Sequence, residues 1–225
     1  MTDQHVVIPP QQILYEDENL IAVDKSEGIA SIAENDATID SLHSLLERQF
    51  AQKLFIIHRL DKEVSGIILF AKNPRTHKFL NDQFAERKVK KYYTALVLGS
   101  IKENEGVIKK PIREFGSGRM GIDDRKGKPS KTKFRVAERF RDYTLLELNP
   151  STGRRHQLRV HLYSIGYPIV GDVKYGDKTI QEKFSRIMLH AKRLEFLLPG
   201  EKLISVEAPL PDSFRNQLKE LTKNG

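Results

Sequence analysis

Apolar residues along the chain gather in short runs that have the length and pattern of β-strands. The runs at 13–15 and 20–23 flank polar residues, which predicts a strand, a turn and a second strand. Residues 91–99 alternate between two faces, and Tyr93 lies on the same face as Ala95 and Val97. The predicted strands are 13–15, 20–23, 66–71, 91–99, 134–136, 143–148 and 203–206.

Four other segments place apolar residues at the spacing of an α-helix. They are residues 38–50, a segment from Pro74 to near Val89, residues 153–166, and a last helix that Pro211 and Asp212 open. Asp36 or Thr38 is the candidate N-cap of the first helix, and Asn73 is that of the second. Gly166 suits the position just after the third.

The order of these elements predicts an α+β fold, because strands and helices mix without a regular βαβ alternation. Residues 100–130 contain seven Gly or Pro and few large apolar residues, so we expect a loop or an irregular hairpin insertion there. The sequence shows no internal repeat and no long linker. We therefore expect residues 1–225 to form a single domain.

Composition excludes several classes of site and compartment. The chain has no Cys, so disulfides, thiolate metal sites and Cys nucleophiles are excluded. Its apolar runs are shorter than the ~18 residues that cross a bilayer. The N-terminus lacks the basic start and the apolar segment of a secretory signal. We expect a cytoplasmic protein.

The net charge of +8 is concentrated in one part of the chain, which we call the basic segment, residues 109–141. It contains twelve Lys or Arg and four acidic residues, whereas the charges of the remaining residues balance. A local positive field attracts polyanions, most often nucleic acid. The alternative is a solvated loop, and a membrane surface is disfavoured because no basic amphipathic helix accompanies the charge.

Two clusters of polar residues border predicted core elements. Residues 58–66 precede a strand, and residues 152–161 lie at a helix start. Buried charges need partners, and Arg beside Asp keeps the carboxylate ionised. A structural salt bridge or ordinary surface charge is the alternative. A metal site is disfavoured, because His156 and His161 are five residues apart and do not face together on a helix.

These clusters belong to a longer resemblance. Residues 58–72, HRLDKEVSGIILFAK, resemble the signature of the RluA family of pseudouridine synthases. Residues 91–99, KYYTALVLG, and 152–162, TGRRHQLRVHL, are similar to two further motifs of that family, and 166–172 and 189–191 follow in family order. Val64 stands where the family usually has Thr, which keeps the shape and removes a hydroxyl.

The resemblance implies a fold and a reaction. The fold is that of the pseudouridine synthases, a mixed, mainly antiparallel sheet core with flanking helices. The reaction isomerises a uridine in tRNA or large-subunit rRNA: the N1–C1′ bond breaks, the uracil turns, and C5 bonds to C1′. The family uses no cofactor and no metal, so none is expected here.

The resemblance also assigns residues. Asp61 matches the catalytic aspartate, which acts as nucleophile or base. Tyr93 matches the tyrosine that packs on the target base, and Arg159 matches the basic partner of the aspartate. Arg59 resembles an arginine that contacts RNA where the flipped nucleotide has left the stack. We expect Asp61 and Arg159 to form an ion pair, with Tyr93 beside them.

An inactive RNA-binding module of the same fold is the alternative function. Asp61, Tyr93 and Arg159 are all present, which favours an active enzyme. The residues before the first motif are too few for the S4 RNA-binding domain that many family members carry. We therefore expect a catalytic domain alone, acting on RNA as a monomer without an obligatory protein partner.

Overall fold

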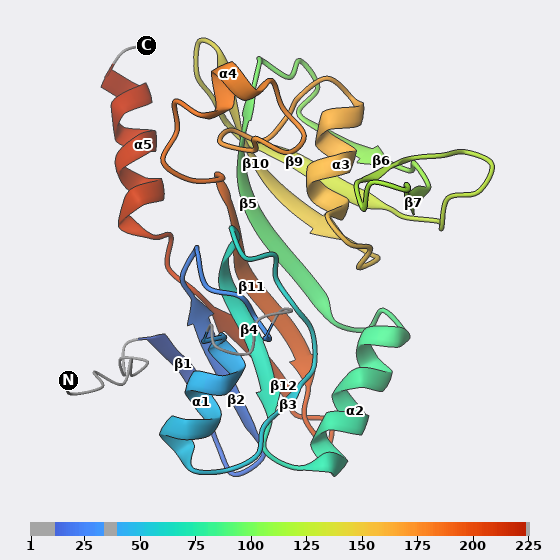
Figure 1. The fold of residues 1–225 in the computed structure, drawn as a ribbon, viewed down its shortest axis with the longest axis vertical. Helices are drawn as coiled ribbons and strands as arrows, with labels where there is room; N and C mark the ends of the chain where they lie inside the picture. Colours follow the sequence, from blue (N-terminus) through green and yellow to red (C-terminus); the bar gives the residue numbers. More distant parts are fainter. Residues whose placement is uncertain (1–11, 34–39, 224–225) are drawn as a thin grey trace. The chain divides into compact units, whose positions relative to one another are not determined.

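The chain folds into two units (Figure 1). The first contains Met1–Val89 and Lys192–Pro209, and the second contains Lys90–Ala191 and Leu210–Gly225. This computed structural model describes residues 12–33 and 40–223. Within those ranges, no helix combines the length and the apolar character needed to cross a membrane.

A sheet with a helix on each face forms the first unit. Its order is β1 (Ile13–Glu16), β2 (Leu20–Lys25), β4 (Ser65–Ala71), β11 (Leu189–Leu197), with β3 (Phe55–Ile56) paired to β4 and β12 (Leu203–Glu207) paired to β11. Leu20 and Leu69 pack on the side of α2 (Pro74–Ala85), whereas Ile21 and Phe70 pack on the side of α1 (Leu42–Phe50). Because both faces are covered, β2 and β4 are apolar almost throughout.

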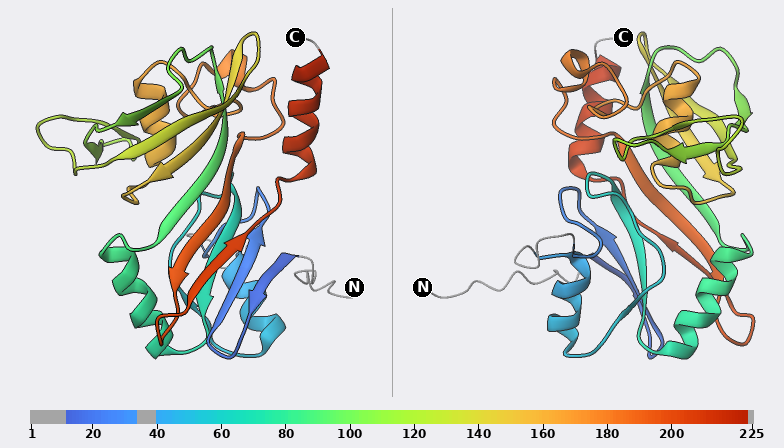
Figure 2. Two further views of the ribbon diagram at one scale, coloured as in Figure 1. Left: turned by 180° about the vertical axis from the view of Figure 1, so that it is seen from behind. Right: turned by 45° about the vertical axis from the view of Figure 1, so that its right-hand side comes forward.

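The second unit has its own antiparallel strands, in the order β5 (Lys90–Leu98), β10 (Tyr143–Pro150), β9 (Thr132–Arg139), β6 (Glu105–Ile108). A separate hairpin pairs β7 (Ile112–Glu114) with β8 (Met120–Ile122), and it packs against α3 (Gln157–Ser164), as Figure 2 shows. The remaining helices are α4 (Lys178–Gln181) and α5 (Asp212–Lys223).

The strand predictions are confirmed, several strands being longer than predicted. Residues 100–130 form β6 and the β7–β8 hairpin, so the expected hairpin insertion is present. Five further strands were not predicted, because their apolar runs are short or interrupted: β3, β6, β7, β8 and β11. The arrangement confirms the α+β class with a mixed, mostly antiparallel sheet.

The four predicted helices are present, with corrected boundaries. α1 begins at Leu42 because Ser41 caps it, so the predicted caps, Asp36 and Thr38, which lie outside the described residues, are wrong. Asn73 caps α2 as predicted, its Oδ1 accepting from the Thr76 amide at 2.9 Å. That helix ends at Ala85, before Val89, since Arg87 adopts a left-handed conformation with φ 61°.

The third predicted helix starts later than residue 153. His156 precedes it with φ 53°, a left-handed conformation that helical residues do not adopt, so α3 begins at Gln157. The Gln157 side chain accepts from the Arg154 amide at 3.1 Å and from the Thr152 hydroxyl at 2.6 Å. These bonds hold 152–156 as a loop. Gly166 follows the helix with φ 88°, as expected for a residue just past its end.

Candidate active site

Asp61 lies in the first unit, in the loop between β3 and β4. Its side chain is half-buried, Arg59 is exposed, and Leu60 and Val64 are buried. The Val64 amide donates to the Asp61 carbonyl at 3.1 Å, which makes a tight turn after the carboxylate. Val64, which stands where the family usually has Thr, is 2% exposed.

Two buried polar side chains fix the backbone on either side of Asp61. The Ser31 hydroxyl donates to the Leu60 carbonyl at 2.8 Å and accepts from its amide at 3.1 Å. Lys25 is 0% exposed, and its Nζ donates to the Lys62 carbonyl at 3.1 Å. The same ammonium donates to the carbonyls of Ser26 and Ile29 at 2.9 and 2.8 Å. The loop is therefore anchored by side chains from the preceding segment.

His58 anchors the start of this loop. Its Nε2 accepts from the Leu69 amide of β4 at 3.2 Å, and its ring stacks on Phe84 of α2 with centroids 4.9 Å apart. A nitrogen that accepts carries no proton, so Nε2 is unprotonated in this arrangement. His58 thus joins the loop to β4 and α2.

Tyr93 lies in the second unit, on β5, opposite Leu148 of β10. Its side chain is half-buried. Lys91, two residues earlier on β5, joins this strand to the loop before α3. Its carbonyl accepts from Asn149 Nδ2 at 2.8 Å, and its Nζ donates to the Thr152 carbonyl at 3.2 Å. The strand that carries Tyr93 and the loop that leads into α3 are therefore held together.

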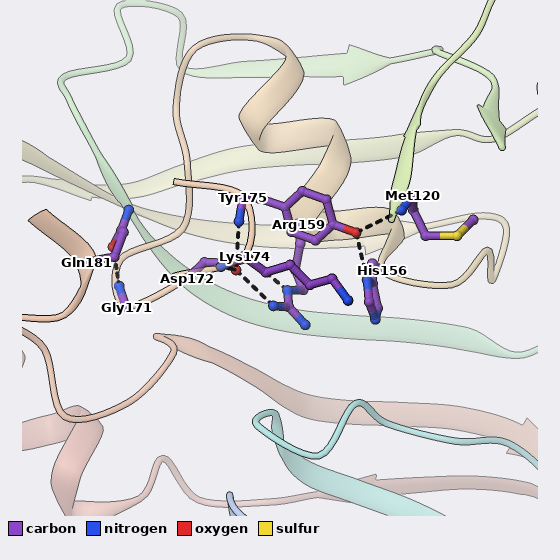
Figure 3. A network of polar contacts seen from close by, with 8 residues as sticks. All are labelled: Met120, His156, Arg159, Gly171, Asp172, Lys174, Tyr175 and Gln181. Carbon is purple, nitrogen blue, oxygen red and sulfur yellow. Dashed lines mark hydrogen bonds and ion pairs between the residues drawn. The ribbon is translucent and has the colours of Figure 1, made fainter. Parts of the chain in front are cut away.

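Arg159, on α3, forms a buried two-point ion pair with Asp172 (Figure 3). Its Nε lies 2.8 Å from Asp172 Oδ2, and its Nη2 lies 2.8 Å from Oδ1. The arginine side chain is 4% exposed and the aspartate side chain 0%. Two parallel charge-assisted bonds fix the plane of the guanidinium as well as its position. Arg159 is therefore held in one orientation.

The loop that follows α3 in turn holds the Asp172 side chain. The amides of Lys174 and Tyr175 donate to Asp172 Oδ1 at 3.1 and 3.3 Å. Gly171, the preceding residue, has φ 78°, and a Cβ there would lie 1.8 Å from the Arg186 carbonyl oxygen. Only glycine fits this close approach, so Gly171 permits the turn that presents Asp172.

Tyr175 connects this pair to His156 and to the β7–β8 hairpin (Figure 3). Its hydroxyl lies 2.7 Å from His156 Nδ1 and accepts from the Met120 amide at 3.3 Å. The Arg159 guanidinium carbon lies 5.3 Å from the centre of its ring, within the range of a cation–π contact. The polar network therefore extends from α3 to the hairpin.

Comparison with known proteins gives the family of this chain. Residues 19–164 match the family described as RNA pseudouridylate synthase. The chain belongs to this family. It is 37% identical over 210 residues to an uncharacterized RNA pseudouridine synthase of Zymomonas mobilis, covering 91% of this chain and 95% of that protein.

Two further relatives agree. Ribosomal large subunit pseudouridine synthase C of Pasteurella multocida is 39% identical over 224 residues, covering 94% of this chain and 68% of that protein. The structure of human RNA pseudouridylate synthase domain containing 4 is similar with a TM-score of 0.78 and 28% identity, covering 94% and 93% of the two chains. The chain is an RNA pseudouridine synthase, which confirms the activity and the fold that the motifs implied.

The four site residues predicted for this synthase lie in both units. Asp61 and Arg59 belong to the first, and Tyr93 and Arg159 to the second. The ion pair between Asp61 and Arg159 stays a prediction. The sequence alone indicated no role for Asp172, Lys25 or Ser31. Asp172 is the last residue of segment 166–172, which follows the family order. It could have been identified from the sequence, because a buried Arg needs a carboxylate partner.

His161 of the synthase is a buried structural residue. It is 0% exposed, with Nδ1 2.9 Å from the Thr132 hydroxyl and Nε2 2.9 Å from the Lys110 carbonyl. Burial lowers the pKa of His161, against the opposing effect of the hydrogen bond to Lys110. The described residues contain no group of three His, Asp or Glu arranged to hold a metal ion.

Proposed function

We propose that Asp61 is the nucleophile of this synthase. The observation that carries this proposal is a half-buried carboxylate on a loop whose backbone Ser31 and Lys25 hold on both sides. A fixed nucleophile loses little freedom on reaching the reactive geometry. In the isomerisation the N1–C1′ bond breaks and the C5–C1′ bond forms, while C5 loses a proton and N1 gains one. A carboxylate that attacks the uridine divides this change into easier steps.

Three other residues complete the proposed machinery. Arg159, oriented by Asp172, pairs with Asp61 and stabilises negative charge that develops on the detached uracil. Tyr93 stacks on that base. Arg59, which is exposed, occupies the space that the flipped nucleotide leaves in the RNA. The two units thereby act as one catalytic domain.

The basic segment is the proposed docking surface for RNA. Some of its cations already have partners: Arg135 pairs with Glu147 at 2.6 Å, and Arg113 pairs with Asp123 at 3.0 Å. Arg125, Lys126 and Lys128 are exposed on the turn between β8 and β9. Their ammonium and guanidinium groups suit phosphate contacts, which position RNA without reading its bases.

Large-subunit rRNA is the proposed substrate, with tRNA as the alternative. Support comes from the relatives named ribosomal large subunit pseudouridine synthase C, which match over most of this chain. We also propose that the protein is a monomer and that it is cytoplasmic, since a chain without Cys fits a reducing compartment.

Mapping of pseudouridines in cellular RNA tests this function. Carbodiimide labelling and primer extension are applied to RNA from cells with the gene, without it, and with the gene carrying Asp61→Asn. We expect a signal in large-subunit rRNA that disappears without the gene and does not return with the variant. A lost signal in tRNA alone would identify the alternative substrate. An unchanged map, with RNA binding by the purified protein, would support an inactive binding module.

A further inference from the structure

A cavity of about 450 Å³ lies between the β7–β8 hairpin and α3, within the second unit. Its volume falls in the range of ~300–1,000 Å³ that is usual for small-molecule sites. Residues that line it include Phe115, Arg119, Val160, Tyr163, Ser164 and Tyr175. None of them is a residue to which the proposed mechanism gives a role.

Two aromatic side chains at this cavity are unusually open to solvent. Tyr163 is 48% exposed and Phe115 is 39% exposed. A Cβ at Gly121 would lie 2.8 Å from the Phe115 ring, so the glycine in β8 leaves room for that ring. Exposed aromatic faces beside a cavity offer stacking surfaces for a planar ligand.

Guanidinium groups accompany these rings. Arg113 lies 4.6 Å from the centre of the Phe115 ring, and Arg119 lies 5.2 Å from that of Tyr175. Of the described residues that line the cavity, Arg119 alone is charged. Arg113 and Arg119 both belong to the basic segment. Arg113 is paired with Asp123, so the cavity combines aromatic walls with the positive charge of Arg119, which suits a planar ligand attached to an anion.

The floor of the cavity is part of the network around Arg159. Tyr175 is 2% exposed, and Tyr163 lies 6.4 Å from it, centroid to centroid. The same Tyr175 ring contacts the Arg159 guanidinium, and its hydroxyl points to His156 and Met120 (Figure 3). The Tyr175 ring would thus lie between a ligand in the cavity and Arg159, which we assign to the active site.

We propose that this cavity binds one unpaired nucleobase of the substrate RNA, other than the uridine that is isomerised. The proposal rests on the proposed function, in which the enzyme binds an RNA substrate. Other proteins bind single-stranded RNA in the same way, with aromatic side chains that stack on the bases and cations that contact the phosphates. A base seated here would fix the position of the RNA along the second unit.

A fluorescence experiment tests the site directly. The chain contains no Trp, so Tyr163→Trp creates a single reporter at the cavity, and Leu203→Trp creates a matched reporter on β12, at an exposed position outside it. The ligand is a decamer of riboadenylate. Inorganic polyphosphate of equal charge, which has no bases, is the control ligand. We expect the decamer to quench the Tyr163→Trp protein only, and polyphosphate to quench neither.

The RNA affinities of variants without a Trp reporter give a second readout. With a fluorescein-labelled decamer, anisotropy is expected to show that Tyr163→Ala weakens binding about tenfold, as loss of one base–aromatic stack does. Tyr163→Phe, which keeps the ring, should stay within about twofold of the unchanged protein by the same reasoning. Position 163 is exposed on a helix, where Ala is well tolerated.

The outcomes separate the nucleobase site from the proposed docking of RNA by the basic segment. Binding of the decamer without quenching of the Tyr163→Trp protein overturns the nucleobase site and leaves docking by the basic segment standing. Quenching by polyphosphate to the same extent overturns it too, because the site would then recognise anions alone. If replacing Arg125, Lys126, Lys128 and Lys131 has no effect on binding while quenching persists, the docking proposal fails and the nucleobase site stands.

Discussion

Asp172 holds Arg159 through both carboxylate oxygens, each 2.8 Å from a different guanidinium nitrogen, with both side chains buried. Desolvation of two charges is costly, and the geometry of the pair offsets that cost only while both partners are present. The pair therefore matters for stability as well as for the orientation of Arg159.

Loss of one partner of this pair should destabilise the fold. We expect Asp172→Asn to lower the free energy of unfolding by about 3–5 kcal/mol, because it leaves a buried guanidinium without its counter-charge. Urea unfolding measures the change. Arg155→Gln breaks the exposed pair of Arg155 with Glu114 and should cost only about 0–1 kcal/mol. Equal effects of the two substitutions would contradict the assignment.

Removal of the Asp61 carboxylate should abolish turnover. Asn is nearly isosteric with Asp but is not an effective nucleophile, so Asp61→Asn and Asp61→Ala are expected to bind RNA, fold normally and form no pseudouridine. Glu63→Gln, at an exposed carboxylate two positions away, is the control and should stay active. Release of tritium from C5-labelled RNA measures turnover. Activity of Asp61→Asn within about tenfold of the unchanged enzyme, a loss of only ~1.4 kcal/mol, would exclude a nucleophilic role.

Chelation should leave the rate unchanged. The proposed mechanism uses side chains alone, so dialysis against EDTA is expected to preserve turnover. The tritium-release assay is repeated before dialysis, after it, and after addition of zinc or magnesium. A loss that either metal restores would revive a metal-dependent mechanism.

The ring of Tyr93 should matter more than its hydroxyl. If the residue stacks on the target base, Tyr93→Ala removes an interaction of about 1–3 kcal/mol, whereas Tyr93→Phe keeps it. The measurement is kcat/KM of both variants, with Tyr92→Phe as a control on the opposite face of β5. A larger loss in Tyr93→Phe than in Tyr93→Ala is incompatible with stacking.

The exposed cations of the basic segment should set the salt dependence of RNA binding. Each phosphate contact contributes about −0.7 to −0.9 to the log–log slope of affinity against salt. Replacing the exposed Arg125, Lys126 and Lys128 and the half-buried Lys131 with Gln should weaken binding and flatten the slope, with little change in kcat at saturating RNA. The same replacement at Lys178, Lys183, Lys219 and Lys223 removes equal charge elsewhere and is the control. If both variants behave alike, the effect is one of net charge only.

His161 should make the enzyme less stable in mild acid. Burial lowers the pKa of His161 in the folded state, so the unfolded chain binds a proton first as the pH falls below about 6.5. The free energy of unfolding then falls with pH by at most about 1.4 kcal/mol per unit. Urea unfolding between pH 7 and 5 is expected to show a flatter dependence for His161→Gln than for His43→Gln. Equal slopes would show that His161 does not titrate differently in the two states.

Local patterns along the sequence determined most of the secondary structure and the family. Apolar runs and alternation gave the seven predicted strands, and Asn73 with Pro74 gave the start of α2, because these signals act between residues close in the chain. The motifs around Asp61, Tyr93 and Arg159 gave the activity. No local pattern marked β7 and β8, whose three-residue strands are too short for a recognisable period.

Tertiary structure decided what holds the site residues in place. Lys25 looks like an ordinary charged residue in the sequence, yet it is fully buried and its ammonium supports the Asp61 loop. Asp172 becomes the partner of Arg159 because a turn through Gly171 brings it to α3. The left-handed conformation of His156 likewise moves the start of that helix. Each depends on contacts between residues distant in sequence, whose energies no local propensity contains.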